Sequence, residues 1–233
     1  MGISDMGTNT QQNITPTSAP RVDTSPYVVV HFPAQGRQLP ADHGHALYSA
    51  ITGQLPALRG ASWLGIELLS GVPWREGIIV LPARGASLRL RIPADRYGYV
   101  LPLAGCPLDI AGYSVHLGIP AARPLQPACS LYARIVTIEG FNEPEPLLNA
   151  ARRQLDALGL TANLELPIDE QGRFRRRVIK IHGRSVMGFS LAAHNLSDND
   201  SLHLQSVGIG GHRAMGCGIF NPMVNSSTQK EQR

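Results

Sequence analysis

Residues 208–220 read Gly-Ile-Gly-Gly-His-Arg-Ala-Met-Gly-Cys-Gly-Ile-Phe and follow Ser-Asp-Asn-Asp-Ser-Leu-His-Leu-Gln at 197–205. The earlier stretch predicts a short capped helix, and the final Ile-Phe predicts the start of a buried strand. The five glycines of residues 208–218, here called the glycine segment, let the backbone take positive φ and approach a ligand closely. Because His212 and Arg213 stand in its middle, the segment is predicted to bind a phosphate backbone. The alternative is a flexible surface turn.

The glycine segment differs from the two common nucleotide-binding motifs. A P-loop places Gly-Lys-Ser/Thr at the start of a helix that follows a strand, and the dinucleotide fingerprint also follows a strand. Here the order is helix, loop and strand, and the segment contains no lysine. We therefore expect no nucleotide cofactor.

The rest of the chain predicts one order of elements twice. In the C-terminal half, strands and a long helix precede the short helix, and they are predicted at 131–138, 145–158 (helix), 174–181 and 185–193. In the N-terminal half, the elements are predicted at 27–32, 42–51 (helix), 63–69, 77–82, 87–92, 94–101 (helix) and 108–119. Asp42 is the expected helix cap, and the stretch 87–92 alternates apolar residues with arginine, as a half-exposed strand does. The repeated β-α-β-β-α-β order predicts an α+β fold of tandem ferredoxin-like, or RRM-like, domains.

We expect the two domains to span residues 25–122 and 129–223, joined by a Pro-rich linker at 120–129. The polar segments 1–24 and 224–233 are expected to be disordered. The usual RNA-binding aromatic motifs of such domains are not apparent on the central strands, so RNA binding would use another surface.

The charge balance favours a polyanionic partner. The 233 residues carry a formal net charge of +4, and the pI is about 9.2. Lys180 and Lys230 are the only lysines, and the planar fork of arginine suits phosphates and guanine edges.

Cysteine usage and hydropathy predict a cytoplasmic protein. Cys106, Cys129 and Cys217 are far apart and form no CxxC pair, which favours a reducing compartment. No apolar run approaches the length of a transmembrane helix, so no membrane partner is expected.

The strongest basic cluster lies in the predicted hairpin at 171–184, here called the basic hairpin. Its basic residues are Arg173, Arg175, Arg176, Arg177, Lys180 and Arg184. Arg173, Arg175 and Arg177 alternate along the sequence and are predicted to share one face of a strand. Because this half also carries the glycine segment, the two predict one basic surface for nucleic acid; the alternative is a solvated hairpin.

Two histidines, His43 and His45, begin the first predicted helix. Helical spacing separates them by about 200°, so they cannot chelate one metal from the same face. No cysteine or carboxylate cluster supplies further ligands, and we expect no metal site. A histidine near a helix N-terminus lies at the positive end of the helix dipole, which favours the neutral imidazole that a general base needs. The alternative for each histidine is a capping or surface residue.

Three stretches carry a resemblance to a known family. They are Phe32–Tyr48 (FPAQGRQLPADHGHALY), Leu131–Phe141 (LYARIVTIEGF) and Val207–Phe220 (VGIGGHRAMGCGIF). Together with the tandem halves, these stretches make about residues 27–222 resemble the CRISPR-associated repeat-RNA endoribonucleases, the Cas-six family, and its branch labelled MYXAN. The resemblance implies the architecture of the RAMP superfamily.

The resemblance implies metal-free cleavage of CRISPR precursor transcripts within each repeat, which yields guide RNAs. Such proteins often stay on the 3′ hairpin of the guide, so CRISPR repeat RNA and other subunits of an interference complex, or Cascade, are the implied partners. RNA supplies its own nucleophile, the 2′-OH, and leaves a 2′,3′-cyclic phosphate. The enzyme has to hold this hydroxyl in line with the phosphate, move protons and stabilise charge.

The family's helix histidine aligns by position with His43, which the resemblance makes the implied general acid or base. His45 is the alternative, and Arg37 is a candidate cation beside the phosphate. Tyr48 is a candidate hydrogen-bond donor; its alternative is a core tyrosine. We hypothesise that the glycine segment packs against the first helix across a cleft, so that its amides help to surround one phosphate. The RNA-binding residues of that segment would be Gly208, Gly210, Gly211, His212, Arg213, Gly216 and Gly218.

Three other functions are compatible with the sequence. A subunit that only holds the guide hairpin would bind RNA without depending on the 2′-OH. A general RNA-binding protein would show no preference for repeat hairpins over other stems. A small-molecule enzyme is disfavoured, because the sequence shows no carboxylate pair or cofactor motif.

Overall fold

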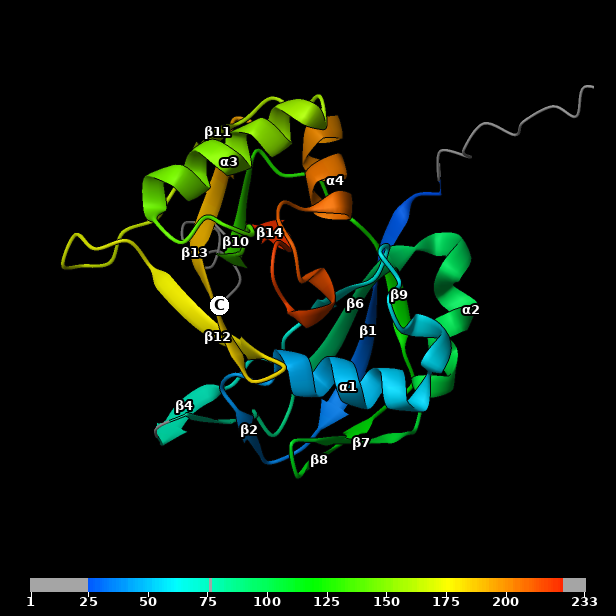
Figure 1. Cartoon of the computed structure of the whole chain (residues 1–233). Helices are drawn as coiled ribbons and strands as arrows, with labels where there is room; N and C mark the ends of the chain where they lie inside the picture. Colours follow the sequence, from blue (N-terminus) through cyan, green and yellow to red (C-terminus); the bar gives the residue numbers. More distant parts are fainter. Residues whose placement is uncertain (1–24, 76, 224–233) are drawn as a thin grey trace, which may run out of the picture.

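The computed structural model describes residues 25–75 and 77–223, which form two halves (Figure 1). The N-terminal half contains β1 (Tyr27–Gln35), β2 (Gln38–Pro40), α1 (Gly44–Gln54), β3 (Gly65–Glu67), β4 (Val72–Arg75), β5 (Ile78–Val80), β6 (Ser87–Pro93), α2 (Tyr97–Val100), β7 (Pro107–Ile110), β8 (Tyr113–Leu117) and β9 (Ala121–Pro124). The C-terminal half contains β10 (Ser130–Val136), α3 (Pro144–Ala157), β11 (Asn163–Glu165), β12 (Arg176–Ile181), β13 (Arg184–His194), α4 (Asp198–Val207), the short 3₁₀ turn η4 (Arg213–Met215) and β14 (Phe220–Pro222).

Strand β1 organises the N-terminal sheet. Its side chains alternate, with Val30, Phe32 and Ala34 buried, as in a strand that has one covered face. One edge of β1 pairs antiparallel with β6, and the other edge pairs first with β9 and then with β8. The sheet order is therefore β3-β6-β1-β8-β7, with β9 also on β1, and a separate small sheet has the order β2-β5-β4.

The long strand β13 organises the C-terminal sheet in the same way. One edge pairs with β10, while the other edge pairs with β12 over its first part and with β11 over its last part. β14 closes the sheet on the far edge of β10. Helix α3 lies across this sheet in Figure 1, and its buried residues Leu147, Ala151 and Leu155 follow the helical period that the sequence predicts.

Each half has its own apolar core. One cluster of buried residues draws only on residues 30–117, and a second draws only on residues 131–220. Two antiparallel sheets with their own helices and cores confirm the expected α+β fold of tandem ferredoxin-like halves. The domain limits at 25–122 and 129–223 stay a prediction. No helix among the described residues is long and apolar enough to cross a bilayer.

Several predicted elements need correction. The expected single strand at 108–119 is a hairpin of β7 and β8, whose chain reverses through positive φ at Ala111 and Gly112. Part of the expected linker at 120–129 is strand β9, which pairs with β1. Strands β4 and β11 were not predicted; both are short, with 4 and 3 residues. The expected disorder at 1–24 and 224–233 lies outside the described residues.

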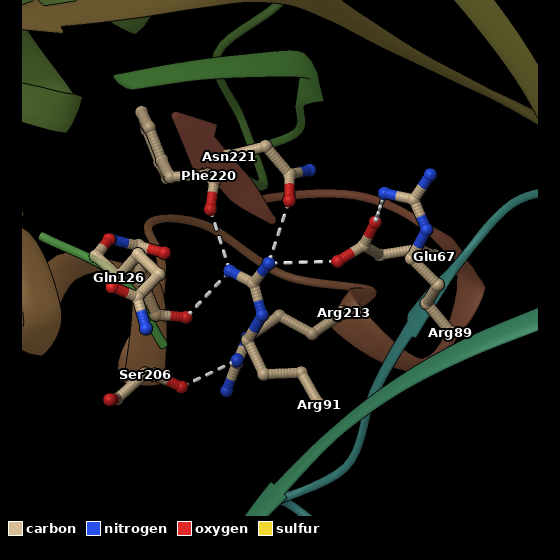
Figure 2. Close-up of polar contacts among 9 residues, drawn as sticks. Glu67, Arg89, Arg91, Gln126, Ser206, Arg213, Phe220 and Asn221 are labelled. Atoms are coloured by element: carbon tan, nitrogen blue, oxygen red, sulfur yellow. Dashed lines mark hydrogen bonds and ion pairs between the residues drawn. The ribbon is translucent and has the colours of Figure 1, made fainter. Parts of the chain in front are cut away.

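A buried arginine joins the two halves and corrects another expectation. Arg91 on β6 is 1% exposed, although the alternating pattern of this strand predicted a solvated arginine. Its Nη1 donates to the carbonyl oxygens of Gln205 (2.9 Å) and Phe220 (2.6 Å), and its Nη2 donates to Glu67 Oε1 and Asn221 Oδ1, both at 2.8 Å (Figure 2). A strand of one half is therefore anchored to a helix and a strand of the other.

Candidate functional site

His43 is a buried part of the fold rather than an exposed group. It is 0% exposed at the N-cap position of α1. The backbone N–H of Leu69 donates to its Nε2 at 3.2 Å, so the proton stands on Nδ1, which donates to the carbonyl oxygen of Pro40 at 2.7 Å. Burial lowers the pKa of this imidazole, against the opposing effect of the Pro40 hydrogen bond. Both ring nitrogens of the histidine that the resemblance favoured are therefore occupied by protein groups.

His45 lies two residues further along and faces the other half. Its ring meets the ring of His182 edge to face, with the centroids 4.3 Å apart and an interplanar angle of 71°. His45 is half-buried in the first turn of α1, whereas His182 is exposed in the two-residue turn between β12 and β13. The structure thus places one imidazole from each half in contact, and the sequence analysis assigned no role to His182.

The tip of the basic hairpin is fixed to the start of α1. Asp42 was the expected helix cap, but the N-cap is His43 and makes no side-chain capping bond. The Asp42 carboxylate instead accepts a hydrogen bond from the backbone N–H of Lys180 at 2.7 Å. Figure 1 shows this end of β12 beside α1. Asp42, which was predicted to cap the helix, therefore holds the hairpin tip where His182 contacts His45.

The glycine segment packs against α1, as we hypothesised. Gly44 begins α1 so close to the carbonyl of Met215 in η4 that an added Cβ would collide with it. The segment also closes on its own half, because a Cβ at Gly210, where φ is +82°, would meet the carbonyl of Thr137. Glycine is needed at these two positions to let backbone approach backbone.

The backbone amides of the five glycines in the glycine segment are not free to bind a phosphate. Each of its five glycines donates its backbone N–H to a protein acceptor. The pairs are Gly208 to Leu204 O, Gly210 to Gln154 Oε1, Gly211 to Thr137 O, Gly216 to Arg213 O and Gly218 to Ile135 O. The expectation that these amides surround a phosphate does not describe this structure, because two local and three tertiary acceptors of the protein already take these five donors.

Arg213 also points into the protein. Its Nη2 donates to the carbonyl oxygen of Ser206 at 2.6 Å, which ties the glycine segment to α4 (Figure 2). Burial lowers the pKa of its guanidinium. The predicted phosphate-binding cation is therefore a structural arginine, whereas its neighbour His212 is exposed and bonds through Nδ1 to Thr137 Oγ1 at 3.0 Å.

A cavity of about 770 Å³ opens beside the histidine pair. It lies between the hairpin tip, the loop after β10 and the glycine segment, and its polar lining includes His182, Arg184, Ser185, Asn142 and His212. Two of these residues, Arg184 and His212, were predicted to bind RNA. Its lining also includes Thr137 and Glu139, so the cavity combines one cation, one carboxylate, two hydroxyls and two imidazoles next to His45.

Two predicted site residues lie elsewhere. Arg37 is exposed and lines a separate hollow of about 620 Å³ with Trp74 and Tyr113. The hydroxyl of Tyr48 accepts a hydrogen bond from the backbone N–H of Gly60 at 3.0 Å, and its ring packs against the N-terminal core. The alternative given for Tyr48, a core tyrosine, matches this position.

The basic hairpin is confirmed as an element, but its faces differ from the prediction. Strand β12 begins only at Arg176, so Arg173 is not on it and instead pairs with Asp169 at 3.1 Å. The hydrogen bonds from Arg173, first of all its backbone N–H, lower the pKa of Asp169. Within β12, Arg176 and Lys180 are exposed, whereas Arg177 is half-buried on the side of the apolar residues. The exposed cations of the hairpin are Arg173, Arg175, Arg176, Lys180 and Arg184.

A second cavity between the halves was not predicted. Its volume is about 560 Å³, and Arg89, Tyr132, Arg134 and Asn221 are among its lining residues. Burial lowers the pKa of Arg134, and the nearby Arg177 acts in the same direction. Within residues 25–75 and 77–223, no three His, Cys, Asp or Glu side chains are grouped so as to hold a metal ion.

Comparison with known proteins agrees with this architecture. The family model described as Cas6 Crispr matches residues 28–225. The CRISPR-associated endonuclease Cas6 of Myxococcus xanthus (strain DK1622) is 41% identical over 196 residues, which cover 84% of this chain and 81% of that protein. Among solved structures, a CRISPR associated protein Cas6 has a TM-score of 0.63 at 13% identity over 85% of this chain and 100% of its own. A RAMP protein described as binding different RNA substrates has a TM-score of 0.61 at 12% identity, over 84% of this chain and 100% of its own. The two solved structures show a shared fold, and the family model with the 41% identical relative shows that this chain belongs to the Cas6 family.

Proposed function

We propose that this protein is a metal-independent endoribonuclease that cleaves CRISPR precursor transcripts within the repeat hairpin. Family membership and a relative named as an endonuclease support the class of activity. The observation that carries the proposal is the contact of His45 with His182 beside a cavity lined by Arg184 and His212. Imidazoles and cations are the groups that transfer of an RNA phosphate to its own 2′-OH requires.

The reaction needs no nucleophile from the protein. The 2′-oxygen attacks the adjacent phosphorus, the bond to the 5′-oxygen breaks, and the products end in a 2′,3′-cyclic phosphate and a 5′-hydroxyl. The protein has to hold these atoms in line and stabilise the charge that grows on the phosphate oxygens. Arg184 is the cation of the cavity lining, and His212 lies in the same lining, so we assign charge stabilisation to these two residues.

We assign the proton transfer at the 2′-OH to His45 rather than to His43. Both ring nitrogens of His43 are engaged with backbone groups, and the side chain is fully buried. Neither nitrogen can reach an RNA hydroxyl without breaking the turn that leads into α1. His45 is half-buried and contacts a residue of the cavity lining. The sequence left His43 and His45 as alternatives for this role, and the different surroundings of the two side chains favour His45.

The basic hairpin is the proposed binding surface for the stem of the repeat. Its five exposed cations lie between the turn at 169–173 and the far end of the hairpin, where Arg184 lines the cavity. Contacts of this kind with phosphates position a duplex without reading its sequence. We further propose that the product stays on the 3′ hairpin, within a complex with other interference subunits. The three cysteines are unpaired, which suits the cytoplasm.

The first test is cleavage of a labelled CRISPR repeat hairpin in excess EDTA. The wild type should cut and leave a 2′,3′-cyclic phosphate, and a 2′-deoxynucleotide upstream of the cut should abolish cutting without weakening binding. His45→Ala should slow cleavage by about 10²–10⁴-fold, the usual contribution of an acid or base. The matched control is His203→Ala, which removes an exposed histidine on α4.

The outcomes of this test separate the candidate functions. Cleavage at the wild-type rate by His45→Ala would refute its assigned role. A requirement for added metal ions would refute the metal-free mechanism. Tight binding of the repeat without cutting by the wild type would support the alternative of a guide-holding subunit.

A further inference from the structure

We infer that His182 is a second catalytic residue, which donates the proton to the departing 5′-oxygen while His45 removes the proton from the 2′-OH. This inference rests on the proposed function and assigns a second residue to the same site. His182 belongs to the C-terminal half and His45 to the N-terminal half. The site is therefore complete only where the two halves meet.

The position of His182 suits a group that touches the reacting phosphate. It is exposed, and it lines the cavity next to Arg184 and Ser185 while its ring contacts His45. The attacking and leaving oxygens are bonded to one phosphorus atom, so the groups that exchange protons with them have to stand close together. Two imidazoles in contact at the edge of a cavity that also presents Arg184 meet this requirement.

The backbone conformation at His182 also bears on its position. His182 and Gly183 are the two central residues of the hairpin, with φ of +49° and +76°, and each thus has the positive φ of a type I′ turn. Such turns favour Asn-Gly, and histidine is, with asparagine and aspartate, among the residues other than glycine that take a positive φ most readily. The turn therefore holds His182 in a defined backbone conformation at the tip of the hairpin.

The hairpin tip is also held in place rather than left to move. The hydrogen bond from the Lys180 backbone to Asp42 lies two residues before His182 and fixes the strand to the start of α1. A positioned group loses less entropy in the transition state than one that has to find its place. Asp42 therefore acts as a positioning residue for the pair.

The roles of the two histidines follow from their places in the fold. A general base has to start neutral, and a general acid has to start protonated. His45 is half-buried in the first turn of α1 and is the residue to which the proposed function assigns the proton of the 2′-OH. His182 is exposed in the hairpin turn, where it can regain a proton from water after it has given one to the 5′-oxygen. We therefore assign the base to His45 and the acid to His182.

The bonds and protons of this step balance. One bond forms between the 2′-oxygen and phosphorus, and one bond breaks between phosphorus and the 5′-oxygen. His45 gains the proton of the 2′-OH, and His182 loses its proton to the 5′-oxygen. The exchange of one proton with water at each histidine then restores the starting forms, and no co-reactant is needed.

The test compares an ordinary repeat RNA with one that has a bridging 5′-sulfur at the scissile phosphate. A thiolate leaves without a proton, so only the oxygen substrate needs an acid. His182→Asn keeps a residue that the turn favours while it removes the imidazole. We expect this variant to cut the oxygen substrate about 10²–10⁴-fold more slowly than the wild type and the sulfur substrate at nearly the wild-type rate. His45→Ala should be slow on both substrates.

The pH profile of single-turnover cleavage supplies a second readout. An acid and a base together give a bell-shaped profile, and His182→Asn should lose the limb that falls at high pH. The other titratable or charged groups around the pair are Asp42, Lys180, Arg184, Glu139 and His212, which all remain in this variant. Unfolding midpoints and RNA affinity of His182→Asn should equal those of the wild type, with His182→Gly as a second variant that suits the turn.

Each outcome bears on either the inference or the proposed function. Equal slowing of His182→Asn on both substrates would overturn proton donation, since a residue that only binds the phosphate would slow both. Wild-type rates on both substrates would also overturn it while leaving the nuclease assignment intact. Failure of the wild type to cut the oxygen substrate in EDTA would instead refute the proposed function.

Discussion

The junction between the halves and the cavity beside it use the same residue types in opposite ways. Toward the junction, Arg91 and His43 are buried and Arg213 is half-buried, and all three side chains are held by hydrogen bonds to other groups of the protein. Beside the cavity, His182 and Arg184 are exposed. A basic residue in this fold is therefore available for a ligand only if other groups of the protein do not already use its hydrogen bonds.

The junction also explains why the site can be assembled from two halves. Arg91 donates to two carbonyl oxygens and one side chain of the C-terminal half, and to Glu67 of its own half. Such a buried arginine, with hydrogen bonds from both of its Nη atoms, fixes the geometry between two sheets, because any displacement leaves a charge without partners. The contact of His45 with His182 depends on this fixed arrangement.

The largest effect is expected from the buried arginine of the junction. Arg91→Met should lower the free energy of unfolding by about 3–5 kcal/mol, because it leaves the half-buried Glu67 carboxylate and buried carbonyl groups without a partner. Urea unfolding monitored by circular dichroism measures this change. The matched control is Arg89→Met on the same strand, whose side chain is 44% exposed and pairs with the same Glu67. Its cost should stay below about 1 kcal/mol, and equal costs for the two variants would contradict the comparison.

His43 should behave as a structural residue with a pH signature. His43→Ala should lower the free energy of unfolding by about 1–3 kcal/mol, because the Leu69 N–H and the Pro40 carbonyl lose their partner. The pKa of His43 in the fold lies below its ordinary 6.5, so the unfolded chain binds the proton more readily. The contribution of His43 is therefore present above pH 6.5 and is lost as the pH falls below it.

Urea midpoints of the wild type and His43→Ala between pH 8 and pH 5 check this prediction. The difference between the two proteins should shrink toward low pH. His45→Ala is the control, since its side chain makes no buried hydrogen bond among the described residues, and its midpoints should follow those of the wild type. A constant difference across the pH range would contradict the proposed neutral, buried state of His43.

A smaller and salt-dependent effect is expected at the basic hairpin. Arg175→Ala with Arg176→Ala removes two exposed cations, and unfolding should change little. For a duplex such as the repeat stem, each lost phosphate contact lowers the slope of log affinity against log salt by about 0.9, so the pair should lower it by about 1.8. Repeat-RNA binding at several salt concentrations measures the slope. The control is Arg59→Ala, an exposed arginine of the N-terminal half, and an equal change in both variants would show that the hairpin has no special role.

The tandem fold could be predicted because its signals are local. The strand at 27–32, the helix at 145–158 with Gly159 behind it, and the capped helix before the glycine segment appear in the structure with shifts of a few residues at their ends. The short strands β9 and β11 could not be predicted, because their hydrogen bonds go to strands far away in the sequence. Strand β4 pairs with its neighbour β5, but its four residues include Pro73, which argues against a strand.

Sequence alone determined the order of the main elements, the basic character of the hairpin and the glycine-rich connection between the last helix and the last strand. Periodicity and glycine content are properties of neighbouring residues, so they can be read along the chain. Only the tertiary structure decided that Arg91 is buried, that Arg213 points inward, that the glycine amides are occupied, and that His182 meets His45. These outcomes depend mainly on partners from other elements of the fold, and a hydrogen bond between distant residues leaves no pattern in the residues beside them.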